Sequence, residues 1–137
     1  MPVIMWTPDL AVGHEKIDEQ HKQLFKAADD LAEAIFAGVG EVEVGKTIDF
    51  LAEYTSVHFR DEEALMNEHG YPGYPAQKDQ HDRFETTITD LRRKYKSGEL
   101  GTGVAVDVLT KACTWFKEHI RTLDRHLGLY LQENAKK

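Results

Sequence analysis

The sequence predicts an all-α protein that folds as an up-down-up-down antiparallel four-helix bundle with an N-terminal arm. Four stretches carry apolar residues at spacings of three and four, which is the period of one helix face, and none alternates in the way of a strand. Most of the glycine and proline lies between these stretches, as is typical of a bundle with short connections. A chain of 137 residues is about the size of one domain, so we expect a single domain over residues 1–137.

The first predicted helix runs from near Asp18 to Phe36, where Gly38 and Gly40 end it. The arm before this helix has no clear period, but it contains Trp6, a large apolar group that we expect to pack across the bundle. The predicted inward face of this helix comprises His21, Leu24, Phe25, Ala28, Leu31 and Ile35.

The second predicted helix extends roughly from Val44 to Asn67, and the glycine- and proline-rich run from Gly70 to Pro75 breaks it. We expect Met66, near its end, to serve only in packing. The inward stripe comprises Ile48, Leu51, Ala52, Thr55, His58, Phe59, Glu62, Leu65 and Met66.

The third predicted helix runs from about Ala76 to Lys96 with a heptad-like seam. The fourth carries one apolar face up to His119, and Asp124 lies just beyond it. We expect the tail after Gly128 to fray. The seam residues are Gln77, His81, Phe84, Ile88, Leu91 and Tyr95 in the third helix and Val104, Val108, Ala112, Trp115 and His119 in the fourth.

The composition argues against several classes of partner and location. The formal net charge of −7 disfavours nucleic acid and anionic membrane surfaces, which are bound through clustered lysine and arginine. The single cysteine, Cys113, cannot form an internal disulfide, and we expect it to be a small buried residue. The sequence contains neither an apolar run of about 18 residues nor a signal peptide, so we expect no membrane span and a cytoplasmic protein.

Each apolar stripe is interrupted by a polar residue, although a buried polar group is costly unless it is paired or bound to a metal. All four helices contribute to this set. Because residues four apart lie one above the other on a helix, His58 and Glu62 project to nearly the same point, and so do Gln77 and His81. The interrupting residues are His21, His58, Glu62, Gln77, His81 and His119, followed by Asp124.

The step of five residues from His119 to Asp124 fits an ideal helix poorly. It turns the carboxylate by roughly 140° away from the imidazole. Asp124 reaches inward only if the last turn of the helix is distorted or its side chain bends around the seam.

Four imidazoles and two carboxylates are enough to hold two cations, because each carboxylate can bridge the pair and offset its charge. Imidazole with carboxylate suits iron, zinc or manganese, and the lack of an inward cysteine argues against a cluster of the iron–sulfur kind. We interpret the set as a site for two non-haem iron ions. The remaining histidines, His14, His69 and His126, fall in loops or off the seams, and we expect them to face solvent.

These motifs together identify a family resemblance that covers nearly the whole chain. The run from Ile17 to Phe25, the segment from His58 to Glu63, Gly70-Tyr71-Pro72, His81, and His119-Ile120 with Asp124 resemble the bacterial hemerythrins in residue type, order and spacing.

The resemblance implies that His21 and His58 ligate one iron and that His81 and His119 ligate the other. Glu62 and Asp124 would bridge the two irons together with an oxo or hydroxo group. By the same resemblance, dioxygen would bind end-on at the iron held by His21 and His58. Ile120 would form part of an apolar wall beside it.

The sequence departs from the family pattern at Gln77, where the family has the first of two histidines spaced four apart. An amide oxygen is a poorer donor to iron than imidazole is. Either the second iron is labile or carries water, or Gln77 is a core amide hydrogen-bonded to a neighbour with little effect.

The leading functional prediction is a dioxygen carrier, store or sensor and not an enzyme. The alternative is a diiron redox enzyme that uses dioxygen or peroxide, because Gln77 would open the second iron. A ferritin-like protein would need two Glu-x-x-His motifs, and the sequence has none. A structural zinc bundle or a bundle without metal stays open at this point.

Overall fold

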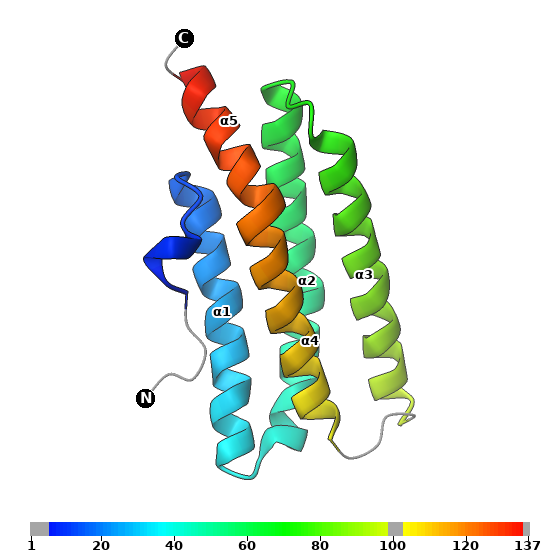
Figure 1. Cartoon of the computed structure of the whole chain (residues 1–137). Helices are drawn as coiled ribbons and strands as arrows, with labels where there is room; N and C mark the ends of the chain where they lie inside the picture. The colour runs from blue at the N-terminus through cyan, green and yellow to red at the C-terminus, as the bar shows by residue number, and fades with distance from the viewer. Residues whose placement is uncertain (1–5, 99–102, 136–137) are drawn as a thin grey trace.

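The computed structural model describes residues 6–98 and 103–135, and it contains four main helices that run alternately up and down (Figure 1). They are α1 (Glu15–Phe36), α2 (Gly40–Glu68), α3 (Tyr74–Lys96) and α4 (Val104–His119). No strand occurs within the described ranges. The predicted fold class, an antiparallel four-helix bundle, is therefore confirmed.

Three shorter elements complete the chain. A 3-10 turn, η1 (Pro8–Leu10), lies in the N-terminal arm. After α4 come a π-helical turn, η2 (Ile120–Asp124), and a final helix, α5 (Arg125–Ala135). In Figure 1 α5 continues the direction of α4, so these segments form one long rod with an irregular turn inside it.

The bounds of the helices differ from the predicted ones by a few residues. His14 caps α1, because its Nδ1 accepts a hydrogen bond from the backbone nitrogen of Ile17 at 3.4 Å. As predicted, the run from Gly70 to Pro75 separates α2 from α3. The third helix begins at Tyr74 and not at Ala76, so Pro75 lies in its first turn, where its missing N–H has no partner to lose. Gly40 is the first residue of α2 instead of a terminator of α1.

Gly38 ends α1 in the left-handed conformation, with φ +81°. Its backbone nitrogen donates to the carbonyl of Ile35 at 3.1 Å, and that of Val39 donates to Ala34 at 2.8 Å. This pair of bonds is a Schellman motif, which satisfies carbonyls that the end of the helix leaves unpaired. The predicted termination at Gly38 is confirmed.

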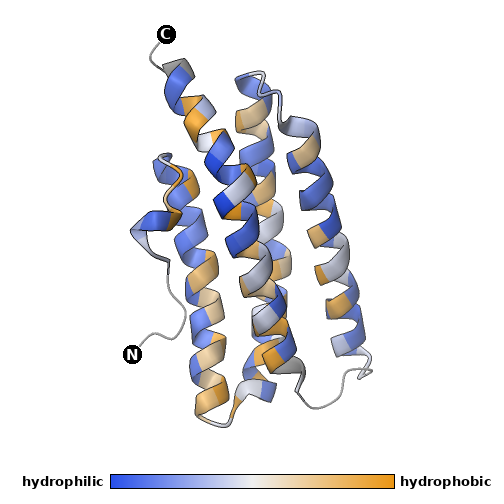
Figure 2. Ribbon diagram, in the orientation of Figure 1, coloured by the Kyte–Doolittle hydropathy of each residue, from blue (hydrophilic) through white to orange (hydrophobic). Residues whose placement is uncertain are grey.

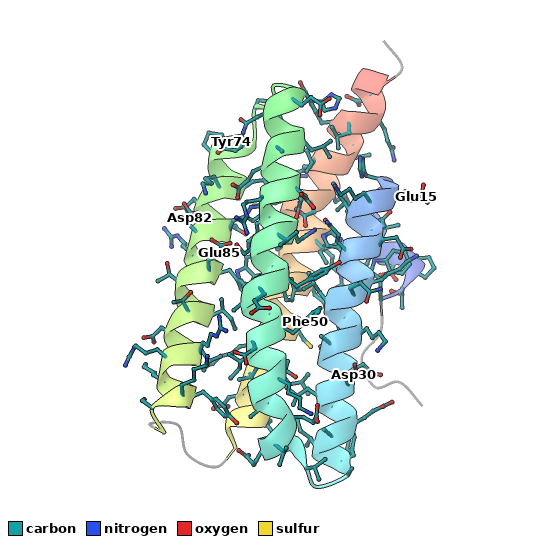
Figure 3. The ribbon with its side chains drawn as sticks, turned by 180° about the vertical axis from the view of Figure 1, so that it is seen from behind. Glu15, Asp30, Phe50, Tyr74, Asp82 and Glu85 are labelled. Carbon is teal, nitrogen blue, oxygen red and sulfur yellow. The ribbon has the colours of Figure 1, made fainter. Side chains whose placement is uncertain are left out.

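The core lies along the axis of the bundle, and each helix carries apolar residues beside polar ones (Figure 2). Seen from the reverse side, side chains fill the space between the ribbons (Figure 3). Met66 is fully buried, as expected, whereas Cys113 is only half-buried. The face of α4 is wider than predicted, because Phe116 is buried while Trp115 is half-buried. Val104 lies outside the described side chains.

The prediction that the tail frays after Gly128 is wrong for the segment up to Leu131. Leu127 and Leu131 are buried, at 0% and 8% exposure, in α5. Gly128 permits this packing, because a Cβ at this position would lie 1.9 Å from the carbonyl oxygen of Val12 in the N-terminal arm.

The N-terminal arm covers one end of the core. Leu10 and Val12 are buried, and Trp6 packs partly buried against the core, as predicted. The ammonium of Lys22 lies 4.7 Å from the centre of the Trp6 ring. None of the described helices is both long enough and apolar enough to cross a membrane.

Candidate metal centre

The seven residues predicted from the interrupted stripes all lie in the interior of the bundle. Each has between 0% and 3% of its surface exposed. Every main helix contributes at least one of them, and the π turn contributes the last. The set comprises His21 on α1, His58 and Glu62 on α2, Gln77 and His81 on α3, His119 on α4 and Asp124 in η2.

The π turn explains how Asp124 reaches the interior. In a π turn the hydrogen bonds join residues five apart, so residues at that spacing lie on the same side of the helix. His119 precedes the turn and Asp124 ends it. As a result, Oδ1 of Asp124 lies 3.2 Å from Nε2 of His119. Of the two ways in which Asp124 was expected to reach inward, the structure therefore contains the distorted turn.

Two groups of side chains within this cluster could each hold a cation, and they share one residue. The first group is His21, His58, Glu62 and Asp124, and the second is His81, His119 and Asp124. Within each group the potential ligand atoms lie within 4.8 Å of one another.

Asp124 faces both groups with different oxygens. Its Oδ2 lies 3.0 Å from Nε2 of His21, and its Oδ1 lies 3.2 Å from Nε2 of His119. In the first group Oε1 of Glu62 lies 2.6 Å from Nε2 of His58. In the second, Nε2 of His81 lies 3.2 Å from Nε2 of His119. The Nε2 atoms thus converge on the shared carboxylate.

Three of the four imidazoles are oriented by a polar side chain on their outer nitrogen. Oε1 of Gln20 lies 2.5 Å from Nδ1 of His58. Oε2 of Glu63 lies 2.9 Å from Nδ1 of His81, and Oε1 of Gln80 lies 2.9 Å from Nδ1 of His119. An acceptor at Nδ1 keeps the proton there and leaves the Nε2 lone pair directed inward, which is the usual arrangement around a ligating histidine.

The sequence reasoning missed these orienting residues. Gln20 directly precedes His21, Glu63 follows Glu62, and Gln80 precedes His81. Their position at the edge of an inward stripe was the available signal. Gln20 is held in turn by donating to Asp61 Oδ2 at 2.8 Å.

Several buried polar atoms in the cluster have no hydrogen-bond partner among the described residues. These atoms are both ring nitrogens of His21, both carboxylate oxygens of Glu62, Oε1 of Gln77 and Oδ2 of Asp124. The short contacts of His21 and Glu62 therefore lack hydrogen-bond geometry. Unsatisfied buried groups of this kind are costly, and a cation among them would satisfy most of their lone pairs. The donor set fits bound metal.

Burial keeps two of the imidazoles neutral, as a metal ligand must be. It lowers the pKa of His58 to about 4. Burial and the neighbouring His119 together lower the pKa of His81 to about 3. For His119 itself, burial lowers the pKa, but the Asp124 carboxylate outweighs burial and the net shift is upward.

The two carboxyl groups differ in their pKa. Burial, reinforced by the charge of Asp124, raises the pKa of Glu62 well above its ordinary value. Burial also acts to raise the pKa of Asp124, but His119 and His21 outweigh it and hold that pKa well below its ordinary value. Two carboxylates this close repel each other when both are ionised, and positive charge between them would relieve that repulsion.

Aromatic rings hold the second group in place. Phe59 stacks on His81 with ring centres 3.9 Å apart and an interplanar angle of 4°. Trp115 stacks on His119 at 4.6 Å and 11°. Ile120, next to His119 in the chain, is only 1% exposed.

The other three histidines take no part in the cluster. His69 and His126 are exposed, as predicted. His14 is half-buried, so the prediction that it faces solvent is wrong, because it caps α1.

The chain is similar to known proteins over nearly its whole length. The family model for the hemerythrin HHE cation binding domain matches residues 12–130. The bacteriohemerythrin of Stenotrophomonas maltophilia (strain R551-3) is 32% identical, with 98% of this chain and 90% of that protein covered. That of Methylococcus capsulatus (strain Bath) is 30% identical, with 93% and 96% covered. The crystal structure of wild-type hemerythrin superposes with a TM-score of 0.84 at 29% identity, covering 94% of this chain and 98% of that one.

Proposed function

We propose that this chain, which belongs to the hemerythrin family, is a non-haem diiron protein that binds dioxygen as a carrier, store or sensor. The observation that carries the proposal is the buried cluster of four histidines and two carboxylates in which Asp124 faces two groups of donors. The proposal is also supported by the matching family model, which describes a cation binding domain.

In this proposal His21 and His58 hold one iron, and His81 and His119 hold the other. Glu62 and Asp124 would be the carboxylate ligands shared by the two irons, together with an oxo or hydroxo group. The opposite orientation of the two Asp124 oxygens, at 3.0 Å from His21 and 3.2 Å from His119, supports this arrangement.

We assign dioxygen, bound end-on, to the iron position of His21 and His58. The two irons supply the change in oxidation state that this binding needs. Buried apolar residues adjoin this position: Leu24 is one turn from His21 on α1, the ring centre of Phe59 lies 5.8 Å from that of His58, and both residues are 1% exposed. A dry, apolar surrounding also slows the escape of charged oxygen species and protons, which favours release of dioxygen unchanged.

A second candidate, a diiron redox enzyme that uses dioxygen or peroxide, is favoured by one observation. Oε1 of Gln77 is fully buried and has no hydrogen-bond partner among the described residues, while Nε2 of the same amide donates to Asp124. An iron with an additional open position would let an oxygen species react at both metals. The first candidate is preferred because the acids and bases of the described cluster already have other roles: the inner ones face the proposed metal positions, and Glu63 holds Nδ1 of His81.

Metal analysis combined with visible spectroscopy tests the proposal. The purified chain is loaded with ferrous iron without air, its iron content is measured, and spectra are recorded as air is admitted and then removed. We expect two irons per chain and a visible band that appears in air and disappears when oxygen is removed.

Immediate and irreversible conversion to an oxidised spectrum would favour the redox enzyme. Retention of zinc in place of iron, or of no metal, would contradict both candidates.

A further inference from the structure

Gln77 occupies a position in the centre of the cluster but forms only one of the bonds that its side chain offers. It has 0% exposure and lies one turn before His81 on α3. Its Nε2 donates to Oδ1 of Asp124 at 3.0 Å, whereas its Oε1 has no hydrogen-bond partner in the described part of the chain. The bonded oxygen is the one that faces His119, so the amide is located at the second group.

The two groups of donors are therefore unequal. The first has two histidines and two carboxylates, and the second has two histidines and only the shared Asp124. An amide nitrogen has no lone pair free to bind a metal, and the Asp124 carboxylate holds it in place. An amide oxygen is neutral and a weak donor to metals that prefer imidazole.

The second group also lies nearer to solvent. A groove of about 550 Å³ on the surface is lined by Gln80 and Trp115, and it reaches His119 itself. Gln80 is the residue that orients His119. A small molecule in this groove therefore contacts His119, one of the two imidazoles of the second group.

We infer that the two metal positions differ in lability: the metal at His81 and His119 exchanges faster and keeps one coordination place for an exogenous small protic ligand such as water. Such a ligand donates to the unpaired Oε1 of Gln77 and completes the hydrogen bonding of that amide. The inference rests on the proposed function in one respect, namely that the cluster holds two metals.

Metal release measures this difference without relying on oxygen binding. The full chain is loaded with two equivalents of cobalt(II), mixed with an excess of a strong chelator, and followed by its visible absorption. We expect two phases whose rates differ at least tenfold, each accounting for one cobalt ion per chain.

Gln77→His adds an imidazole one turn before His81 on the same face. It should slow the fast phase at least tenfold and leave the slow phase unchanged. Gln23→His is the matched control, because Gln23 is exposed on α1 and the added imidazole lies away from the cluster. Its two phases should match those of the parent.

Gln77→Met tests whether the amide itself is a ligand. The side chain keeps a similar length, so the fast rate should stay within about threefold of the parent if Gln77 only faces an exogenous ligand. A tenfold faster release would show that Oε1 binds the metal, which overturns the open place.

Release of both metals in one phase, or phases in Gln77→His that equal those of the parent, would overturn the unequal lability. In either case two bound metals with reversible oxygen binding would leave the proposed function intact. Failure to bind two cobalt ions would instead contradict the two-metal site itself, on which the inference rests.

Discussion

Glu62 shows how a residue that suits a metal is a poor core residue. Its side chain has 0% exposure, and neither oxygen has a hydrogen-bond partner among the described residues. Without metal, Glu62 must either bear the desolvation cost of a buried charge or take up a proton, as its raised pKa indicates, and both reduce the stability of the folded protein at neutral pH. With metal, the same charge becomes a ligand. The residue therefore reduces the stability of the metal-free protein and increases that of the loaded one.

Glu62→Gln should change these two forms in opposite directions. We expect the metal-free variant to be more stable than the metal-free parent by about 1 kcal/mol, because an uncharged amide replaces a buried carboxylate. Iron loading should stabilise the variant far less than the parent, because stabilisation by a ligand follows its affinity for the folded state.

Urea unfolding at neutral pH, with and without iron, measures both effects. A metal-free variant that unfolds at lower urea than the parent, or one that iron stabilises as much as the parent, would contradict this account of Glu62.

The orienting glutamines should act on separate metal positions. Gln80→Ala removes the partner of His119, and Gln20→Ala removes that of His58. Loss of such a partner usually lowers metal affinity by about 10- to 100-fold. We expect Gln80→Ala to lower the affinity only for the metal at His81 and His119. We expect Gln20→Ala to lower the affinity only for the metal at His21 and His58.

Competitive titration with a chromophoric chelator gives the two affinities. Gln23→Ala, an exposed change on α1, is the control and should leave both affinities as they are. Equal weakening of both metals in each variant would show that these glutamines do not act through the individual histidines.

At the scale of the elements, the contact of α5 with the N-terminal arm decides whether a substitution at Gly128 stabilises or destabilises the protein. Alanine in place of glycine ordinarily stabilises a helix by about 1 kcal/mol. At Gly128 the added Cβ would lie 1.9 Å from the backbone oxygen of Val12. A backbone atom cannot move aside as a side chain can.

We therefore expect Gly128→Ala to destabilise the protein by about 1–3 kcal/mol, the usual range for overpacking. Urea unfolding of the two proteins, both without metal, measures the difference. An unchanged or increased stability would mean that the arm does not pack against α5 as described.

The helices could be predicted because their signals are local. A helix face is recognised from residues close in sequence, such as Leu24 and Leu31 in α1 or Ile48 and Leu51 in α2. The end of α1 is likewise recognised from Gly38 alone. The same spacing indicated the polar residues at the core, and all seven are buried. Their role as metal ligands remains a proposal.

The remaining features depend on contacts between distant segments. α5 packs against the arm, more than 100 residues away in sequence, and this contact could not be seen in the residues after Gly128 alone. Gln20, Glu63 and Gln80 lie beside the inward stripes, and their partners are on other helices.

At the scale of the whole molecule, the buried cluster makes the metal-free protein sensitive to acid. The folded pKa values of His58 and His81, about 4 and about 3, lie below their ordinary value of 6.5. Between these values the unfolded chain binds more protons than the folded one, so stability falls as pH falls. At pH values above 4.5, the ordinary pKa of a glutamate, the raised pKa of Glu62 has the opposite effect on stability. The two histidines together outweigh this single carboxyl group.

We expect the urea midpoint of the metal-free protein to decrease as pH falls from about 6.5 to about 4. His81→Gln should reduce the slope, whereas His69→Gln, a change at an exposed histidine, should not. A midpoint that stays level or rises over this interval would show that the buried histidines are already charged in the folded protein.

The central claim is that one bundle core holds two metals that share Asp124, and anomalous diffraction from crystals of the iron-loaded protein tests it most directly. Data collected at the iron absorption edge should show two peaks inside the bundle about 3.5–4 Å apart, the usual spacing of a two-metal site. One peak should lie beside His21 and His58 and the other beside His81 and His119, with Asp124 between them. A single peak, or peaks only at exposed histidines such as His69 and His126, would contradict the claim.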